Sequence, residues 1–126
     1  MRILLDTHTL LWAAKGSLDS DVQSILEDTA HELYFSPVNL WEIGFKRSKL
    51  SIDLKALHHN LIRNGYLELG LASRHVLCLA QLPLLHTDPF DRILLAQAYS
   101  EHLFLLTSDE ALKQYRSQVD CILGFD

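Results

Sequence analysis

The sequence lacks the features that mark membrane-bound and secreted proteins. No apolar run approaches the roughly 20 residues that a membrane-spanning helix needs. The amino-terminal residues 1–6 reach an acid, Asp6, after three apolar residues, which predicts a strand and not a signal peptide. We therefore expect a cytoplasmic protein that makes no contact with a membrane.

Cysteine and clustered histidine are also scarce. The chain has two cysteines, Cys78 and Cys121, which lie far apart and lack the spacing of metal ligands. Its seven histidines form neither an HxxxH motif nor a His/Cys cluster. The sequence therefore contains no zinc motif, and we expect both cysteines to be reduced residues of the core.

Basic residues are outnumbered by acids, and the net charge is −5. This balance argues against a simple basic nucleic-acid binder. It does not exclude an enzyme that acts on nucleic acid, because a bound metal ion cancels negative charge locally. The one local basic cluster is Lys46, Arg47 and Lys49. The 126 residues, of which 48% are hydrophobic and 21% charged, suit one globular domain spanning 1–126.

Apolar runs typical of strands alternate with helical patterns along the chain. We expect strands at 2–5, 33–35, 66–71, 103–107 and 119–123, and helices at 7–15, 20–29, 38–48, 54–64, 73–81, 90–100 and 108–115. Strands that alternate with helices predict an α/β fold, here a three-layer α/β/α domain with a mainly parallel central sheet.

The helix expected at 90–100 opens with a marked motif. Asp88 suits the N-cap position, and Pro89 suits the first helical position. Asp91 shares a helical face with the apolar residues Leu94, Leu95 and Ala98, so its carboxylate should lie at the top of a buried face. A buried carboxylate needs a cation or hydrogen-bond donors. The alternative is a capped helix whose first-turn acid complements the helix dipole.

Four acids should meet at one edge of such a sheet. Asp6 follows the first strand, and Asp109 closely follows the fourth. Glu42 lies in the helix after the second strand, although Glu42 and Lys46 could also form a surface ion pair. With Asp91, these carboxylates offer hard oxygen ligands, which select Mg²⁺ or Mn²⁺ and not zinc. Such a site is suited to hydrolysis of a phosphodiester.

Four segments of the chain resemble the PIN-domain ribonucleases, and most closely the VapC-like toxins of type II toxin–antitoxin pairs. They are residues 5–12, 41–43, 86–92 and 107–109. The resemblance implies a PIN-like fold, Mg²⁺- or Mn²⁺-dependent endoribonuclease activity on RNA, a homodimer, and inhibition by a small antitoxin protein. The acids that match the family's catalytic and metal positions are Asp6, Glu42, Asp91 and Asp109.

Two details of this match concern neighbouring residues. Asp88 competes with Asp91 for the third acidic position, but Asp91 opens the family's D-x-x-[IL]-x-A-x-A helix pattern and is preferred. Asp88 then keeps the role of N-cap. Asn39 stands where many relatives carry serine, which affects how Glu42 is held.

The remaining expectations concern the substrate, exposed aromatic residues and other functions. Substrate contacts are predicted at Lys46, Arg47, Lys49, Arg92 and Ser108. Trp12 and Trp41 are expected to be core or dimer-interface residues. His8 and His86 are expected to flank the site in hydrogen-bonding roles. The alternative functions are a catalytically silent PIN-like protein-binding module and, less favoured, a receiver-like phosphorylation switch.

Overall fold

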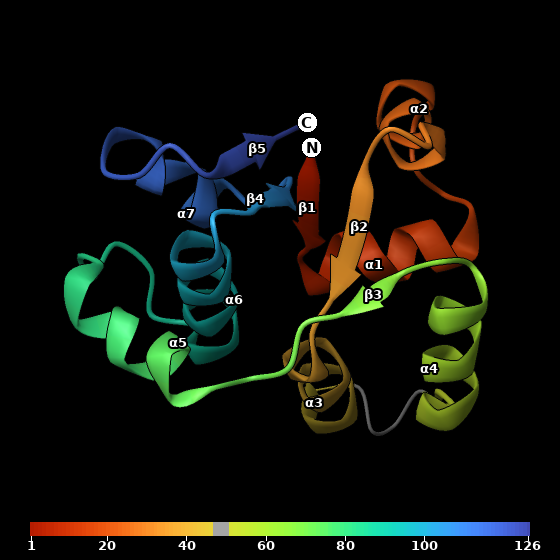
Figure 1. The fold of residues 1–126 in the computed structure, drawn as a ribbon, viewed down its shortest axis with the longest axis horizontal. Coiled ribbons are helices and arrows are strands. Elements are labelled where there is room, and N and C mark those ends of the chain that lie inside the picture. The colour runs from red at the N-terminus through yellow and green to blue at the C-terminus, as the bar shows by residue number, and fades with distance from the viewer. Residues whose placement is uncertain (47–50) are drawn as a thin grey trace.

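The computed structural model describes residues 1–46 and 51–126. Five parallel strands form one sheet in the order β3-β2-β1-β4-β5 (Figure 1). The strands are β1 (Arg2–Leu5), β2 (Glu32–Phe35), β3 (Leu67–Glu68), β4 (Phe104–Thr107) and β5 (Ile122–Gly124). This order differs from the 2-1-3-4-5 order of receiver-like folds, so the receiver-like alternative is wrong.

Helices cover both faces of the sheet. The α-helices are α1 (Thr7–Lys15), α2 (Ser20–Glu27), α3 (Pro37–Lys46), α4 (Leu54–Arg63), α5 (Ser73–Cys78), α6 (Pro89–Glu101) and α7 (Glu110–Lys113), and the short 3₁₀ helices are η2 (Leu79–Gln81) and η3 (Gln114–Ser117). In Figure 1, α5, α6 and α7 lie on one side of the strands, and α1, α2 and α4 lie on the other. The predicted three-layer α/β/α fold is therefore confirmed.

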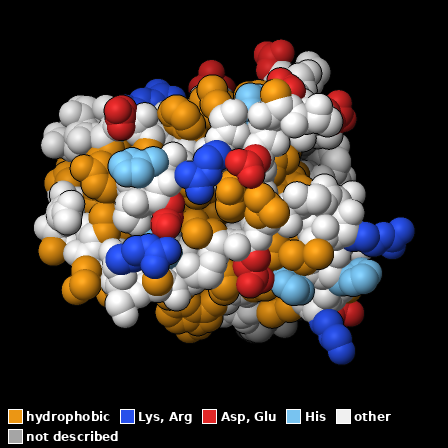
Figure 2. All heavy atoms as spheres, viewed as in Figure 1, with side chains coloured by type: hydrophobic (Ala, Val, Ile, Leu, Met, Phe, Trp, Pro, Cys, Tyr) orange, Lys and Arg blue, Asp and Glu red, His pale blue; other side chains and the backbone are white. Residues whose placement is uncertain are grey.

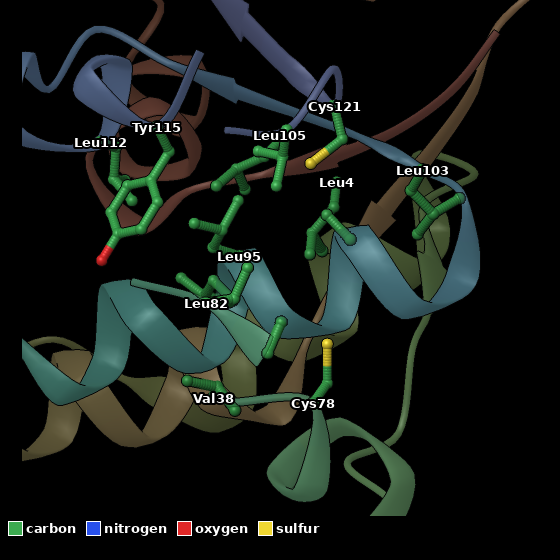
Figure 3. Close-up of a cluster of buried hydrophobic side chains, with 14 of the residues drawn as sticks. Leu4, Val38, Cys78, Leu82, Leu95, Leu103, Leu105, Leu112, Tyr115 and Cys121 are labelled. Carbon is green, nitrogen blue, oxygen red and sulfur yellow. The ribbon is translucent and has the colours of Figure 1, made fainter. Parts of the chain in front are cut away.

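The core divides into two clusters because successive strand residues point to opposite faces of a sheet. On β1, Leu4 packs into the cluster beneath α5, α6 and α7, whereas Ile3 and Leu5 pack into the cluster beneath α1, α2 and α4. On β4, Leu105 and Leu106 divide in the same way. Figure 3 shows side chains of the first of these clusters, with Leu4 and Leu105 on the strand side of α6 and Val38 and Cys78 on its other side.

Both cysteines belong to that first cluster. Cys78 and Cys121 are buried free thiols, and burial raises the pKa of both. The expectation that they are reduced core residues is confirmed. Across the described residues, none of the helices has the length and apolar character needed to cross a membrane.

Several predicted boundaries are wrong for local reasons. Helix α2 is capped by Asp19, whose carboxylate accepts from the Val22 amide, and it ends at Glu27. The predicted strand 66–71 pairs with β2 over only two residues, Leu67 and Glu68, because β2 itself ends at Phe35. The helix predicted at 73–81 tightens into η2 after Cys78. The predicted helix 108–115 divides into α7 and η3, and the strand predicted at 119–123 begins only at Ile122 and ends at Gly124.

The buried face of α3 is more polar than the sequence suggests. Trp41 was expected to be a core or dimer-interface residue, but it is 60% exposed, and Phe45 is 71% exposed. The helix buries Val38, Asn39, Glu42 and Ile43, and Asn39 bonds to the Leu5 carbonyl and to Thr7 at the end of β1. Trp41 is therefore not a core residue of the chain. Figure 2 shows other apolar side chains that reach the surface between scattered charged ones.

Candidate active site

The site begins at the carboxyl end of β1, where Asp6 is buried. Asp6 Oδ1 accepts a hydrogen bond from the Thr9 amide at 2.9 Å, which makes Asp6 the N-cap of α1. Asp6 Oδ2 accepts from Thr107 Oγ1 at 2.5 Å. The same Thr107 oxygen accepts from the Asp109 amide at 3.0 Å. Thr107 thus links two of the predicted acids, a role that sequence reasoning missed.

Asn39 ties the first turn of α3 to the end of β1. Its Oδ1 accepts from the Ser36 amide at 2.7 Å, and its Nδ2 donates to the Leu5 carbonyl at 3.3 Å and to Thr7 Oγ1 at 3.1 Å. Glu42 lies three residues later, on the same face of the helix. Asn39, which departs from the family pattern, therefore holds the helix that carries Glu42.

Glu42, Asp88 and Asp91 form a first acidic group, whose ligand oxygens lie within 4.8 Å of one another. Lys46 Nζ donates to Glu42 Oε2 at 2.8 Å and also pairs with Asp88 Oδ2. The predicted Glu42–Lys46 pair exists, and it is half-buried: the Lys46 side chain is 40% exposed, whereas that of Glu42 is only 5% exposed. Glu42 Oε1 is buried without a hydrogen-bond partner among the described residues.

His86, Asp91 and Asp109 form a second group of possible ligands, again within 4.8 Å of one another. His86 Nε2 lies 2.8 Å from Asp91 Oδ2 and 4.0 Å from Asp109 Oδ2. The hydrogen-bonding role expected of His86 is present in this geometry. Asp109 Oδ1 accepts from the Ala111 amide at 2.8 Å and is the N-cap of α7.

The four predicted acids thus differ in which of the two groups they join. Asp91 belongs to both groups, whereas Asp6 belongs to neither and reaches Asp109 through Thr107. Asp88 is the predicted N-cap, since its Oδ1 accepts from the amides of Phe90 and Asp91 at 2.9 and 3.0 Å. Its other oxygen nevertheless joins the first group. Sequence reasoning treated the helix cap and a place among the site acids as alternatives, but Asp88 caps α6 and also lies in the first acidic group.

Burial and mutual repulsion control the charges of these acids. Burial, together with the negative charges of Asp88, Glu42 and Asp109, raises the pKa of Asp91 to about 7, although the hydrogen bond from His86 opposes the shift. Burial also raises the pKa of Asp6, against the hydrogen bonds from Thr107 and Thr9. Burial would raise the pKa of Asp88 as well, but Lys46 and the amides of the first turn of α6 hold it below its ordinary value.

The predicted substrate-binding residues divide into three cases. Lys46 is engaged in the pairs with Glu42 and Asp88. Arg92 donates from a terminal guanidinium nitrogen to the Leu82 carbonyl at 3.2 Å, and Ser108 lies half-buried between Thr107 and Asp109. Arg47 and Lys49 lie outside the described residues. Substrate contact stays a prediction for all five.

The donor set fits a hard divalent cation. Carboxylate oxygens are the ligands that Mg²⁺ and Mn²⁺ prefer, and they dominate both groups. The buried Glu42 Oε1 atom is an unused ligand atom within this set. A buried oxygen without a donor is costly, and a cation in contact with it would remove that cost.

The sequence of the chain was compared with protein families and with known proteins. The family model of the PIN domain matches residues 3–117, which is most of the chain. The chain belongs to the PIN domain family. No curated protein matches it significantly in sequence.

Solved structures of similar fold were also found for this PIN domain. One is VapBC2 from Rickettsia felis bound to a DNA fragment from its promoter, with 14% identity, full coverage of both chains and a TM-score of 0.73. VapBC-1 from nontypeable Haemophilus influenzae has 15% identity, 98% coverage of both chains and a TM-score of 0.70. DNA-bound VapBC from Salmonella typhimurium has 15% identity, covers 90% of this chain and 91% of the other, and has a TM-score of 0.66.

The raised pKa of Asp91 generates a prediction about stability. The folded protein holds a proton on Asp91 up to about pH 7, whereas the unfolded chain releases it near pH 4. The contribution of Asp91 to stability is therefore present at low pH and lost as pH rises through about 7. Without metal at pH 8, Asp91→Asn should melt roughly 3–6 °C higher than wild type, which corresponds to about 1 kcal/mol. The gap should narrow at pH 5 and close near pH 4, below which Asp91 is protonated in both states.

Thermal melts with and without Mg²⁺ test the prediction that Asp91 is a metal ligand and not only a structural acid. Mg²⁺ should raise the wild-type melting temperature at pH 8, because binding to the native state alone stabilises it. The same ion should have much less effect on Asp91→Asn. If the Asn variant melts lower at pH 8 without metal and wild type ignores Mg²⁺, Asp91 is a structural acid and the assignment is wrong.

Proposed function

We propose that the chain is a Mg²⁺- or Mn²⁺-dependent endoribonuclease that hydrolyses RNA phosphodiester bonds. We propose further that it acts in the cytoplasm as the toxin of a type II toxin–antitoxin pair, with residues 1–126 as a single nuclease domain. The observation that carries this proposal is the pair of acidic groups that share Asp91 at the sheet edge of a PIN domain.

Asp6, Glu42, Asp91 and Asp109 are the proposed catalytic and metal-binding residues. A divalent ion held by these carboxylates would activate a water molecule and offset the charge that develops on the phosphate. Burial of Asp91 and Glu42 limits the access of bulk water, which strengthens electrostatic interactions at the site. His86 orients the Asp91 carboxylate through its hydrogen bond. Thr107 fixes Asp6 relative to Asp109.

A protein inhibitor of this site is proposed to be a small antitoxin. VapBC complexes are the similar structures that suggest a toxin–antitoxin role. Lys46 already pairs with Glu42 and Asp88, so the acidic groups accommodate a basic side chain. An arginine or lysine from the antitoxin would pair with these acids in the same way and compete with the metal.

The toxin is also proposed to form a homodimer. Trp41, Phe45, Leu77 and Leu84 are each at least 60% exposed. Large apolar side chains in such exposed positions favour protein–protein contact. The expectation that Trp41 is a dimer-interface residue is part of this proposal, whereas Trp12 is only partly exposed and lies near His8.

The alternative of a catalytically silent module is disfavoured. All four predicted acids are present, and Asp91 carries a pKa near 7 because of burial and neighbouring charge. Perturbed pKa values of this kind concentrate at functional sites. A purely protein-binding module would have no need to keep several mutually repelling carboxylates at one edge.

Cleavage assays test the proposed chemistry directly. Purified protein, freed of any inhibitor, should cleave structured RNA in the presence of Mg²⁺ or Mn²⁺ and leave 5′-phosphate and 3′-hydroxyl ends. A chelator should abolish cleavage, and Asp91→Asn should reduce the rate by at least about 100-fold, as is typical when an essential group is lost. Cleavage that continues at full rate in the chelator would contradict the metal-dependent mechanism.

RNA binding tests the proposed role of the basic cluster. Because Lys46 is paired with acids, the double variant Arg47→Ala, Lys49→Ala isolates the other two residues. Each lost phosphate contact should reduce the slope of log affinity against log salt by about 1. The matched control, Lys15→Ala with Lys55→Ala, removes the same charge from α1 and α4 and should leave the slope nearly unchanged. Equal slopes for all three proteins would refute the role.

A further inference from the structure

Lys46 places a positive charge inside one of the two acidic groups. It lies at the end of α3, one turn after Glu42. Its ammonium nitrogen is 2.8 Å from Glu42 Oε2 and also contacts Asp88 Oδ2, which comes from the segment before α6. The carboxylates that it joins therefore belong to elements that are far apart in the sequence. Lys46 therefore forms part of the first acidic group through contacts with two of its three acids.

The two acidic groups differ in whether a lysine pairs with their carboxylates. Glu42 and Asp88 each have an ion pair with Lys46. Asp91 and Asp109 have only His86 as a potentially cationic neighbour, and no lysine or arginine within the described ranges pairs with either acid. The first acidic group thus contains a permanent cation, whereas the described residues supply none to Asp91 and Asp109.

Three contacts keep the ammonium in this position. Beyond its two carboxylate partners, Lys46 Nζ lies 5.3 Å from the centre of the Phe90 ring, within the range of a cation–π contact. Asp88 cannot easily turn away, because its Oδ1 atom accepts the two amide hydrogen bonds that cap α6. Glu42 is held by burial, with a side chain that is 5% exposed.

The charges of the first group leave room for one divalent ion. Glu42, Asp88 and Asp91 bring three negative charges when ionised, and Lys46 offsets one of them. The two charges that remain match a single Mg²⁺ or Mn²⁺. One oxygen is also left over for such an ion, because Glu42 Oε2 bonds Lys46 whereas Glu42 Oε1 is buried without a partner in the described structure.

A second divalent ion would compete with the ammonium for the same oxygens. In two-metal nuclease sites the ions lie roughly 3.5–4 Å apart and share carboxylate ligands. Lys46 Nζ already contacts Glu42 Oε2 and Asp88 Oδ2, which are oxygens that a second ion within this group would need.

We propose that Lys46 is a built-in cation that takes the place of a second metal ion and limits the group of Glu42, Asp88 and Asp91 to one divalent ion. The proposal rests on the metal dependence of the proposed function, and it adds the occupancy of this group and the residue that determines it. Lys46 acts here as a positioning residue for Glu42 and Asp88.

Titration with Mn²⁺ tests the proposal without an activity assay. Calorimetry, with electron paramagnetic resonance of free Mn²⁺ as a second readout, gives the number of ions bound per wild-type chain. Lys46→Met keeps an apolar stem of similar length over Phe90 but removes the charge, and it should bind one ion more per chain than wild type. The matched control is Lys15→Met, which removes one charge from the exposed far end of α1 and should bind the same number of ions as wild type.

The outcomes separate this proposal from the proposed function. Equal numbers of ions on wild type and on a folded Lys46→Met would overturn the role of Lys46 while leaving the metal-dependent nuclease intact. No ion on wild type would overturn the nuclease proposal itself. Circular dichroism establishes folding; if the Met variant does not fold, Lys46→Gln, whose amide still donates to a carboxylate, takes its place and should also bind one ion more than wild type.

Discussion

Helix N-termini at the carboxyl edge of a parallel sheet are the constraint on which this structure depends. Asp6, Asp88 and Asp109 are the N-caps of α1, α6 and α7. In each acid, one oxygen accepts backbone amide hydrogen bonds. Amide donors and the positive end of the helix dipole stabilise a carboxylate at such a position. The helices therefore make it possible to gather acids that would otherwise repel one another.

The same arrangement explains how one carboxylate serves both the fold and the site. The second oxygen of each capping acid faces a different partner. In Asp6 it accepts a hydrogen bond from Thr107, in Asp88 it pairs with Lys46, and in Asp109 it lies 4.0 Å from His86 Nε2. Asp91 differs because it lies in the first turn of α6, on the buried face, and is not an N-cap. Its pKa of about 7 follows from that burial and from its acidic neighbours.

Parts of the site could be predicted because they depend on local pattern. The apolar run of β1 followed by Asp6, the Asp88-Pro89 helix start and the spacing of Asp91 to Leu94 and Leu95 are all short-range features. Partners separated by many residues could not be predicted in this way. Lys46 was expected to pair with Glu42 on the surface or to bind RNA, because nothing local shows that Asp88 approaches it across 42 positions.

The sequence by itself determined the alternation of strands and helices, the candidate acids and the buried stripe of α6, since each follows from periodicity or from the chemistry of one residue type. The tertiary structure decided which acids place their carboxylate oxygens close enough together to hold one ion. It excluded Asp6 from both acidic groups, added Asp88 and His86, and turned Trp41 outward while burying Glu42. Sheet order and helix rotation set these outcomes, and both depend on packing between elements distant in the chain.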